Sequence, residues 1–120
     1  MIKFLIHKIV SKLNAISDSY AYAGYRKKYA LPASFKFGGP GNIIYGDGDF
    51  KAGENSYINQ VSIQISKGQK VIVGRNCRFS HNIKIYTESV VADQDLDVDP
   101  WGGINLSKKG DVVIGDGVWV

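Results

Sequence analysis

The sequence predicts an all-β fold: a left-handed parallel β-helix built from hexapeptide repeats, preceded by an α-helix and interrupted by one long protruding loop. Aliphatic residues recur every six positions from residue 40 onward, and internal repeats of this kind are typical of parallel β-helices. Glycine and asparagine recur between them, where the chain has to turn sharply at the corners of each coil. We therefore divide the chain into a helical segment, 1–33, and a β-helix domain, 34–120, whose loop covers about 88–109.

Residues 2–16 are predicted to form an amphipathic helix, which 18–31 continue to an end near Pro32. Lysines and His7 lie mostly opposite an apolar face that consists of Ile2, Leu5, Ile6, Ile9, Leu13 and Ile16. Such a face most often packs on its own domain or on a partner subunit, and basic amphipathic helices also lie on membrane surfaces. The interrupted apolar run does not resemble a signal peptide, and it is too short to span a bilayer.

The β-helix repeats are clearest in the second half of the chain. Inward-facing positions six residues apart fall at Val73, Phe79 and Ile85, accompanied by Cys77 and Ile83, and the pattern returns at Ile114, Val118 and Val120. A weaker, shifted run between 40 and 66 places Ile44, Phe50, Ser56 and Ser62 inside, with Ile58 starting a repeat. Corners are predicted at Gly46, Gly48, Gly53, Asn55, Gly74, Asn76, Asn82, Gly115 and Gly117.

Composition narrows the function classes. The net charge of +4 is concentrated near the N-terminus without interleaved aromatic residues, so no nucleic-acid partner is expected. The single cysteine, Cys77, excludes an intramolecular disulfide and a cysteine-rich zinc cluster. We expect a cytoplasmic protein, with the N-terminal helix offering a route to the inner membrane surface.

Three segments carry a resemblance to a known family: 73–77, 80–87 and 110–119. Over residues 50–120 the chain is similar to the hexapeptide-repeat acetyltransferases, and within them to the maltose, galactoside and polysaccharide O-acetyltransferases. The resemblance implies a homotrimer with active sites between subunits, which transfers an acetyl group from acetyl-CoA to a sugar or polysaccharide hydroxyl without a metal. The resemblance also implies a histidine as the general base, which suits the reaction because the imidazole pKa lies near the operating pH.

The resemblance also suggests site residues. It implies acceptor contacts for Asn59, Tyr86 and Asp93 and a CoA contact for Trp119. Ser66 falls where the family has an acidic acceptor residue, and Val90 occupies the usual position of the catalytic histidine.

Only two histidines are present, and His7 belongs to the N-terminal helix, where it is expected to face solvent. His81, at an outward-facing coil position, is therefore the best candidate for the base. Asp93 and Asp95 are weaker candidates because a carboxylate with an ordinary pKa of about 4 is a poor base for a hydroxyl.

An alternative hypothesis is an inactive or truncated β-helix remnant with a structural or binding role. It rests on Val90 and on a sequence that stops at Val120 in mid-coil, which predicts a truncated chain because natural β-helices cap their open ends. A γ-class carbonic anhydrase, on the same fold, would need three histidines around one zinc ion, and two histidines exclude it.

Overall fold

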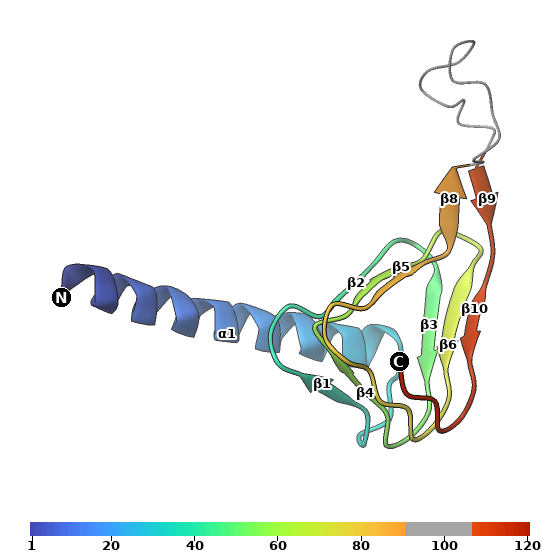
Figure 1. The fold of residues 1–120 in the computed structure, drawn as a ribbon, viewed down its shortest axis with the longest axis horizontal. Helices are drawn as coiled ribbons and strands as arrows, with labels where there is room; N and C mark the ends of the chain where they lie inside the picture. The colour runs from blue at the N-terminus through green and yellow to red at the C-terminus, as the bar shows by residue number, and fades with distance from the viewer. Residues whose placement is uncertain (91–106) are drawn as a thin grey trace, which may run out of the picture.

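The computed structural model describes residues 1–90 and 107–120 of the chain. One helix, α1 (Ile2–Lys28), precedes strands that are mostly parallel and are grouped around a triangular body (Figure 1). The first sheet contains β1 (Lys36–Gly38) and β4 (Tyr57–Asn59), and the second contains β2 (Ile43–Tyr45), β5 (Ser62–Gln64) and β7 (Lys84–Tyr86). The third sheet contains β3 (Asp49–Ala52), β6 (Lys70–Val73) and β10 (Val112–Ile114).

Each of these strands pairs in parallel with the strand one coil away. Phe37 is paired with Ile58 in the first sheet, Ile44 with Ile63 in the second and Phe50 with Val71 in the third. Isolated bridges extend the first sheet from Tyr57 to Arg78 and from Arg78 to Trp119. An N-terminal helix followed by stacked parallel strands is compatible with the predicted β-helix.

The interior of the triangle is filled by one apolar core. Most of the predicted inward positions are buried: Ile44, Phe50, Ser56, Ile58, Val73, Cys77, Phe79 and Ile85. The core also contains five residues that the six-residue pattern did not predict: Phe35, Val61, Ile63, Ile65 and Val71. Burial of such aliphatic and aromatic surface is the main force that holds the short strands together.

The prediction of Ser62 as an inward position is wrong, because its neighbours Val61 and Ile63 are the buried residues. The corner between β4 and β5 is shorter than a strict six-residue repeat requires. Gln60 alone supplies the left-handed backbone there, with φ of 57°. In the next coil Asn82 takes this role, with φ of 61°, and the stretch before it is one residue longer.

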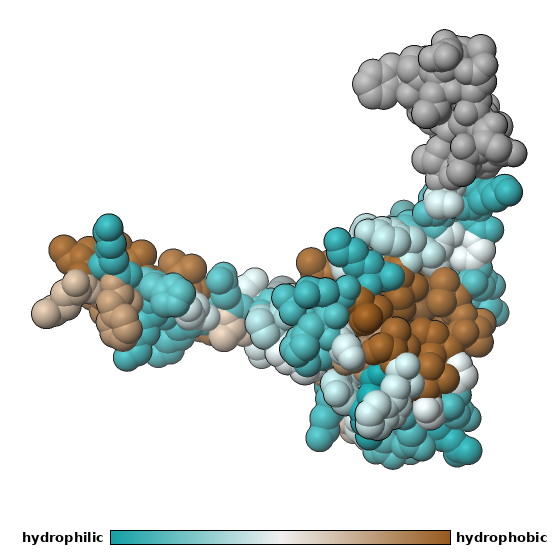
Figure 2. Space-filling view, viewed as in Figure 1, coloured by the Kyte–Doolittle hydropathy of each residue, from teal (hydrophilic) through white to brown (hydrophobic). Residues whose placement is uncertain are grey.

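Val118 and Val120 are 37% and 39% exposed, which contradicts their predicted interior positions. Ile83 and Ile114 are only partly buried. Val118 and Val120 lie in the last coil and have a neighbouring coil on one side only, in residues 76–80. Figure 2 shows a broad apolar area on the triangular end of the body.

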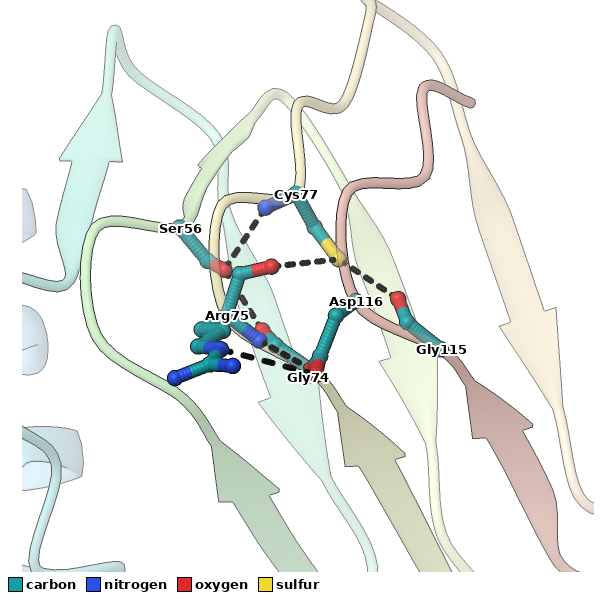
Figure 3. A network of polar contacts seen from close by, with 6 residues as sticks. All are labelled: Ser56, Gly74, Arg75, Cys77, Gly115 and Asp116. Carbon is teal, nitrogen blue, oxygen red and sulfur yellow. Dashed lines mark hydrogen bonds and ion pairs between the residues drawn. The ribbon is translucent and has the colours of Figure 1, made fainter.

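One corner of the coils is held by close backbone approach and polar side chains. An added Cβ atom at Gly53 would lie 2.8 Å from the Gly74 carbonyl carbon, and one at Gly74 would lie 2.8 Å from the Gly115 carbonyl carbon. Ser56 Oγ donates to the Gly74 carbonyl at 2.6 Å and accepts from the Cys77 amide at 2.9 Å. Cys77 Sγ donates to the Gly115 carbonyl at 3.0 Å, so side chains bridge three successive coils (Figure 3).

The two ends of the predicted loop are ordered strands. β8 (Glu88–Val90) pairs antiparallel with β9 (Ser107–Lys109), which corrects the expectation of an irregular loop over the whole of 88–109. Glu88 is directly opposite Lys109, and opposite charges at such cross-strand positions favour pairing. This hairpin projects from the triangular body (Figure 1).

The C-terminal part of α1 is anchored to the body by aromatic residues. Tyr22 stacks on Phe37 with ring centroids 4.5 Å apart, and Tyr29 contacts the edge of Phe50 at 5.8 Å. The helix ends at Lys28, earlier than predicted, because Ala30 adopts a φ of 49° and the Leu31 amide bonds back to the Arg26 carbonyl. This is the geometry of a Schellman motif.

The N-terminal part of α1 extends away from the body (Figure 1). Residues 1–17 are all exposed, so the prediction that the apolar face packs on the chain's own domain is wrong for the described residues. Only the polar side of this part comes near the body, where Ser11 and Asn14 border a groove with Gly39 and Pro40. No helix among the described residues has both the length and the apolar character needed to cross a membrane.

Candidate functional site

The outer face of the first sheet carries a ladder of cationic and aromatic side chains. Lys36, Tyr57, Arg78 and Trp119 occupy paired positions on successive coils. The Arg78 guanidinium carbon lies 5.4 Å from the centroid of the Tyr57 ring, and its Nη1 donates to the carbonyls of Asn55 and Cys77. Trp119 at the end of the ladder is 83% exposed, so its indole face is free to stack on a planar ligand.

Asn59 and His81 lie beside stacked corners at the end of the first sheet. Asn59 is the last residue of β4 and precedes the corner at Gln60, and His81 precedes the corner at Asn82. The Asn82 amide donates to the Gln60 carbonyl at 3.2 Å, so the two corners are stacked. Asn59 is partly buried against the Gly38–Gly39 turn, whereas His81 is exposed.

His81 lies within the stretch that is one residue longer than its counterpart in the preceding coil. The Ser80 amide donates to the Val120 carbonyl at 2.8 Å. Trp119 and Val120 therefore belong to the next coil, which stacks on the coil that contains Ser80. Three of the predicted site residues, Asn59, His81 and Trp119, therefore belong to three consecutive coils of the first sheet. Trp119 is level with Tyr57 at the start of β4, whereas Asn59 and His81 lie at and beyond its end.

The other predicted residues are not part of this group. Tyr86 ends β7 in the second sheet, is 56% exposed and is paired with Gln64. Val90 is the last residue of β8, and its backbone is paired with Ser107. Asp93 and Asp95 lie outside the described residues, and His7 is exposed on α1 as expected.

A polar cluster that was not predicted from the sequence lies at the base of the β8–β9 hairpin. Thr87 Oγ1 lies within 3.1 Å of Gln64 Oε1 and accepts a 2.8 Å hydrogen bond from the Ser66 amide. Ser66 Oγ donates to Glu88 Oε2 at 2.7 Å. The sequence signal for this cluster was Thr87 and Glu88, directly after Tyr86. A threonine at the inner position of a coil indicates a polar cluster, because a buried hydroxyl needs a hydrogen-bond partner.

The bond to Ser66 places the Glu88 carboxylate beside that residue, although the two are 22 positions apart in the sequence. Hydrogen bonds from Ser66 and then Ser107, with Lys109 nearby, hold the pKa of the Glu88 carboxyl below its ordinary value. A carboxylate that is ionised near neutral pH can accept hydrogen bonds from ligand hydroxyls. Its low pKa makes it a poor proton acceptor, so this cluster suits binding better than general base catalysis.

Two further features bear on ligand chemistry. Within residues 1–90 and 107–120, no three His, Cys, Asp or Glu side chains are grouped closely enough to hold a metal ion. A groove of about 740 Å³ lies between α1 and the turn that contains Gly39 and Pro40. Its lining includes Tyr22, Arg26 and Phe37, which anchor the helix, and it contains none of the predicted site residues.

Comparison of the chain with known protein families, with curated proteins and with solved structures finds no significant match in any of the three.

Proposed function

We propose that this chain is a left-handed β-helix of the hexapeptide-repeat class that transfers acetyl from acetyl-CoA to a sugar or polysaccharide hydroxyl. The observation that supports the proposal is that Asn59, His81 and Trp119 belong to three consecutive coils along the short first sheet, with Trp119 level with the start of β4 and Asn59 at its end. An amide for the acceptor, an imidazole for the proton and an exposed indole for a planar donor group thus lie in one region. In a cytoplasmic homotrimer, a neighbouring subunit would complete this open surface.

The roles follow from the chemistry of each group. The His81 imidazole takes the proton from the acceptor hydroxyl, whose oxygen attacks the thioester carbonyl carbon. The carbon–sulfur bond breaks, and the imidazolium returns the proton to the departing CoA thiolate. Backbone N–H groups that face the thioester would stabilise the oxyanion that forms in between.

The first test compares the two histidines of the chain. His81→Gln is expected to lower acetyl transfer by about 10²–10⁴-fold, the usual contribution of a general base, while its binding of acetyl-CoA is retained. His7→Gln is the matched control because His7 is exposed on α1, far along the chain from the coils. Thiol release from acetyl-CoA is measured with a panel of sugar and polysaccharide acceptors. Equal rates for His81→Gln and the wild-type protein would eliminate His81 as the base.

A second candidate function, a non-catalytic β-helix with a structural or binding role, is favoured by one observation. His81 receives no orienting hydrogen bond from any described residue, whereas catalytic histidines are commonly oriented by a third group. Calorimetric titration with acetyl-CoA separates the two candidates. Heat of binding at or below millimolar ligand supports the transferase, and its absence supports the non-catalytic scaffold.

A further inference from the structure

The exposed half of α1 has a continuous apolar stripe that nothing in the described chain covers. Its members are between 47% and 75% exposed over residues 2–16: Ile2, Leu5, Ile6, Ile9, Val10, Leu13 and Ile16. Tyr20, which is 84% exposed, continues the stripe by one more turn. Figure 2 shows apolar atoms gathered at this far end of the helix, separate from those on the body.

The stripe faces away from the β body. The side chains that anchor α1 are Tyr22, Tyr25, Arg26 and Tyr29, which share one face of the helix. Ile16 and Tyr25 are nine residues apart, and at about 100° per residue they lie on opposite faces. Because α1 is one unbroken helix, fixing its anchored face also fixes the direction of the stripe, which cannot fold back onto the body.

The charges beside the stripe select its partner. Lys3 and Lys12, also nine residues apart, lie on opposite margins of the stripe, and Lys8 lies beside Lys12 on one margin. Residues 1–17 contain no Asp or Glu. Two copies of this helix packed stripe to stripe would bring lysines together without acidic partners, whereas anionic lipid headgroups complement lysines on both margins.

We propose that residues 2–20 lie in the plane of an anionic lipid surface, with the apolar stripe inserted among the acyl chains and the lysines at the headgroups. This arrangement is typical of amphipathic helices that bind membranes without crossing them. The anchored half of α1 then holds the first sheet and its candidate site at a fixed orientation to that surface. The inference is independent of acetyl transfer and holds for a non-catalytic scaffold as well.

The test measures flotation of the full chain with vesicles of phosphatidylcholine mixed with phosphatidylglycerol, and with vesicles of phosphatidylcholine alone. The wild-type protein is expected to float with the anionic vesicles and much more weakly with the neutral ones. Replacing Lys8 and Lys12 by Gln is expected to weaken partitioning by about fivefold per lysine. Failure of the wild-type protein to bind anionic vesicles would overturn the proposal.

A charge-matched pair of double variants isolates the stripe. Ile9→Asp with Leu13→Asp places two charges on the apolar face, and Ser11→Asp with Asn14→Asp places the same charges on the polar face. The first pair is expected to bind anionic vesicles at least about tenfold more weakly than the second. Circular dichroism checks that both retain α1.

Equal loss in the two double variants would overturn the role of the stripe. The alternative is that a second copy of the chain covers the stripe, and light scattering without lipid tests it by measuring the molar mass. If Ile9→Asp with Leu13→Asp lowers the molar mass but leaves vesicle binding unchanged, the stripe is a subunit interface and the lipid proposal is wrong.

Discussion

The two halves of α1 differ in what determines their position. The half from Tyr22 to Lys28, with Tyr29 directly after it, carries aromatic residues and Arg26, and several of these side chains contact Phe35, Phe37 and Phe50. The half from Ile2 to Ile16 is at least as apolar, yet none of its side chains is buried. Hydrophobicity alone therefore does not determine which residues of α1 become buried. Burial depends on which face of the helix is anchored, because a rigid helix can present only one face to the body.

The largest difference between the two halves is expected from truncation of an apolar side chain. Tyr29→Ala is expected to lower the free energy of unfolding by about 3–5 kcal/mol, because Tyr29 is buried and packs on Phe50. Leu13→Ala, in the exposed half, is expected to change it by less than about 0.5 kcal/mol. Chemical denaturation measures both. A comparable loss in the two variants would show that the exposed half also packs in the folded protein.

A smaller difference is expected for the cations. Arg26 Nη2 donates to the Phe35 carbonyl at 2.6 Å, and its guanidinium carbon lies 5.4 Å from the centroid of the Phe37 ring. Arg26→Gln is expected to lower the free energy of unfolding by about 1.5–3 kcal/mol, the usual range for a hydrogen bond to a charged group. Lys8→Gln in the exposed half is the control, with an expected change near zero. Thermal denaturation in low salt measures the unfolding midpoints of both variants. Equal shifts in Arg26→Gln and Lys8→Gln would contradict the expected difference.

The smallest effect is expected within the anchored half, from removal of a single hydroxyl. Tyr29 Oη is buried without a hydrogen-bond partner among the described residues, so Tyr29→Phe is expected to stabilise the protein by about 1 kcal/mol. Tyr22 Oη donates to the Gly39 carbonyl at 2.9 Å and accepts from the Asn42 amide, so Tyr22→Phe is expected to destabilise by a similar amount. Opposite shifts in the unfolding midpoint support the assignment, and shifts of the same sign contradict it.

The regular parts of the β body could be predicted because their signal is local. Val73, Phe79 and Ile85 are spaced by one strand and one corner each, and all three are buried as predicted. Asn55, Asn76 and Asn82 were predicted corners and have φ near 60°. Ser62 was misplaced because a shortened corner shifts the inward positions by one residue, and the composition of a corner does not reveal its length.

Tertiary position was harder to predict than local structure. The pattern of 2–16 correctly indicated a helix, but the residues that fix its direction lie in the next turns of α1 and in Phe35 and Phe37. Val118 and Val120 match the repeat but have neighbours on one side only. Of the candidate site, Asn59, His81 and Trp119 were identified from the sequence, whereas Glu88 was missed because its contact with Ser66 joins residues in different coils.

Because of the hydrogen bond from Cys77 to Gly115, the reactivity of the Cys77 thiol reports local opening of the fold. The only thiol of the chain is fully buried and donates to a carbonyl of the last coil, so a thiol-modifying reagent reaches it only when that coil separates from the one before. The rate of modification consequently measures local opening at a single defined place. The folded protein also adds no free thiol of its own to an assay that counts released CoA.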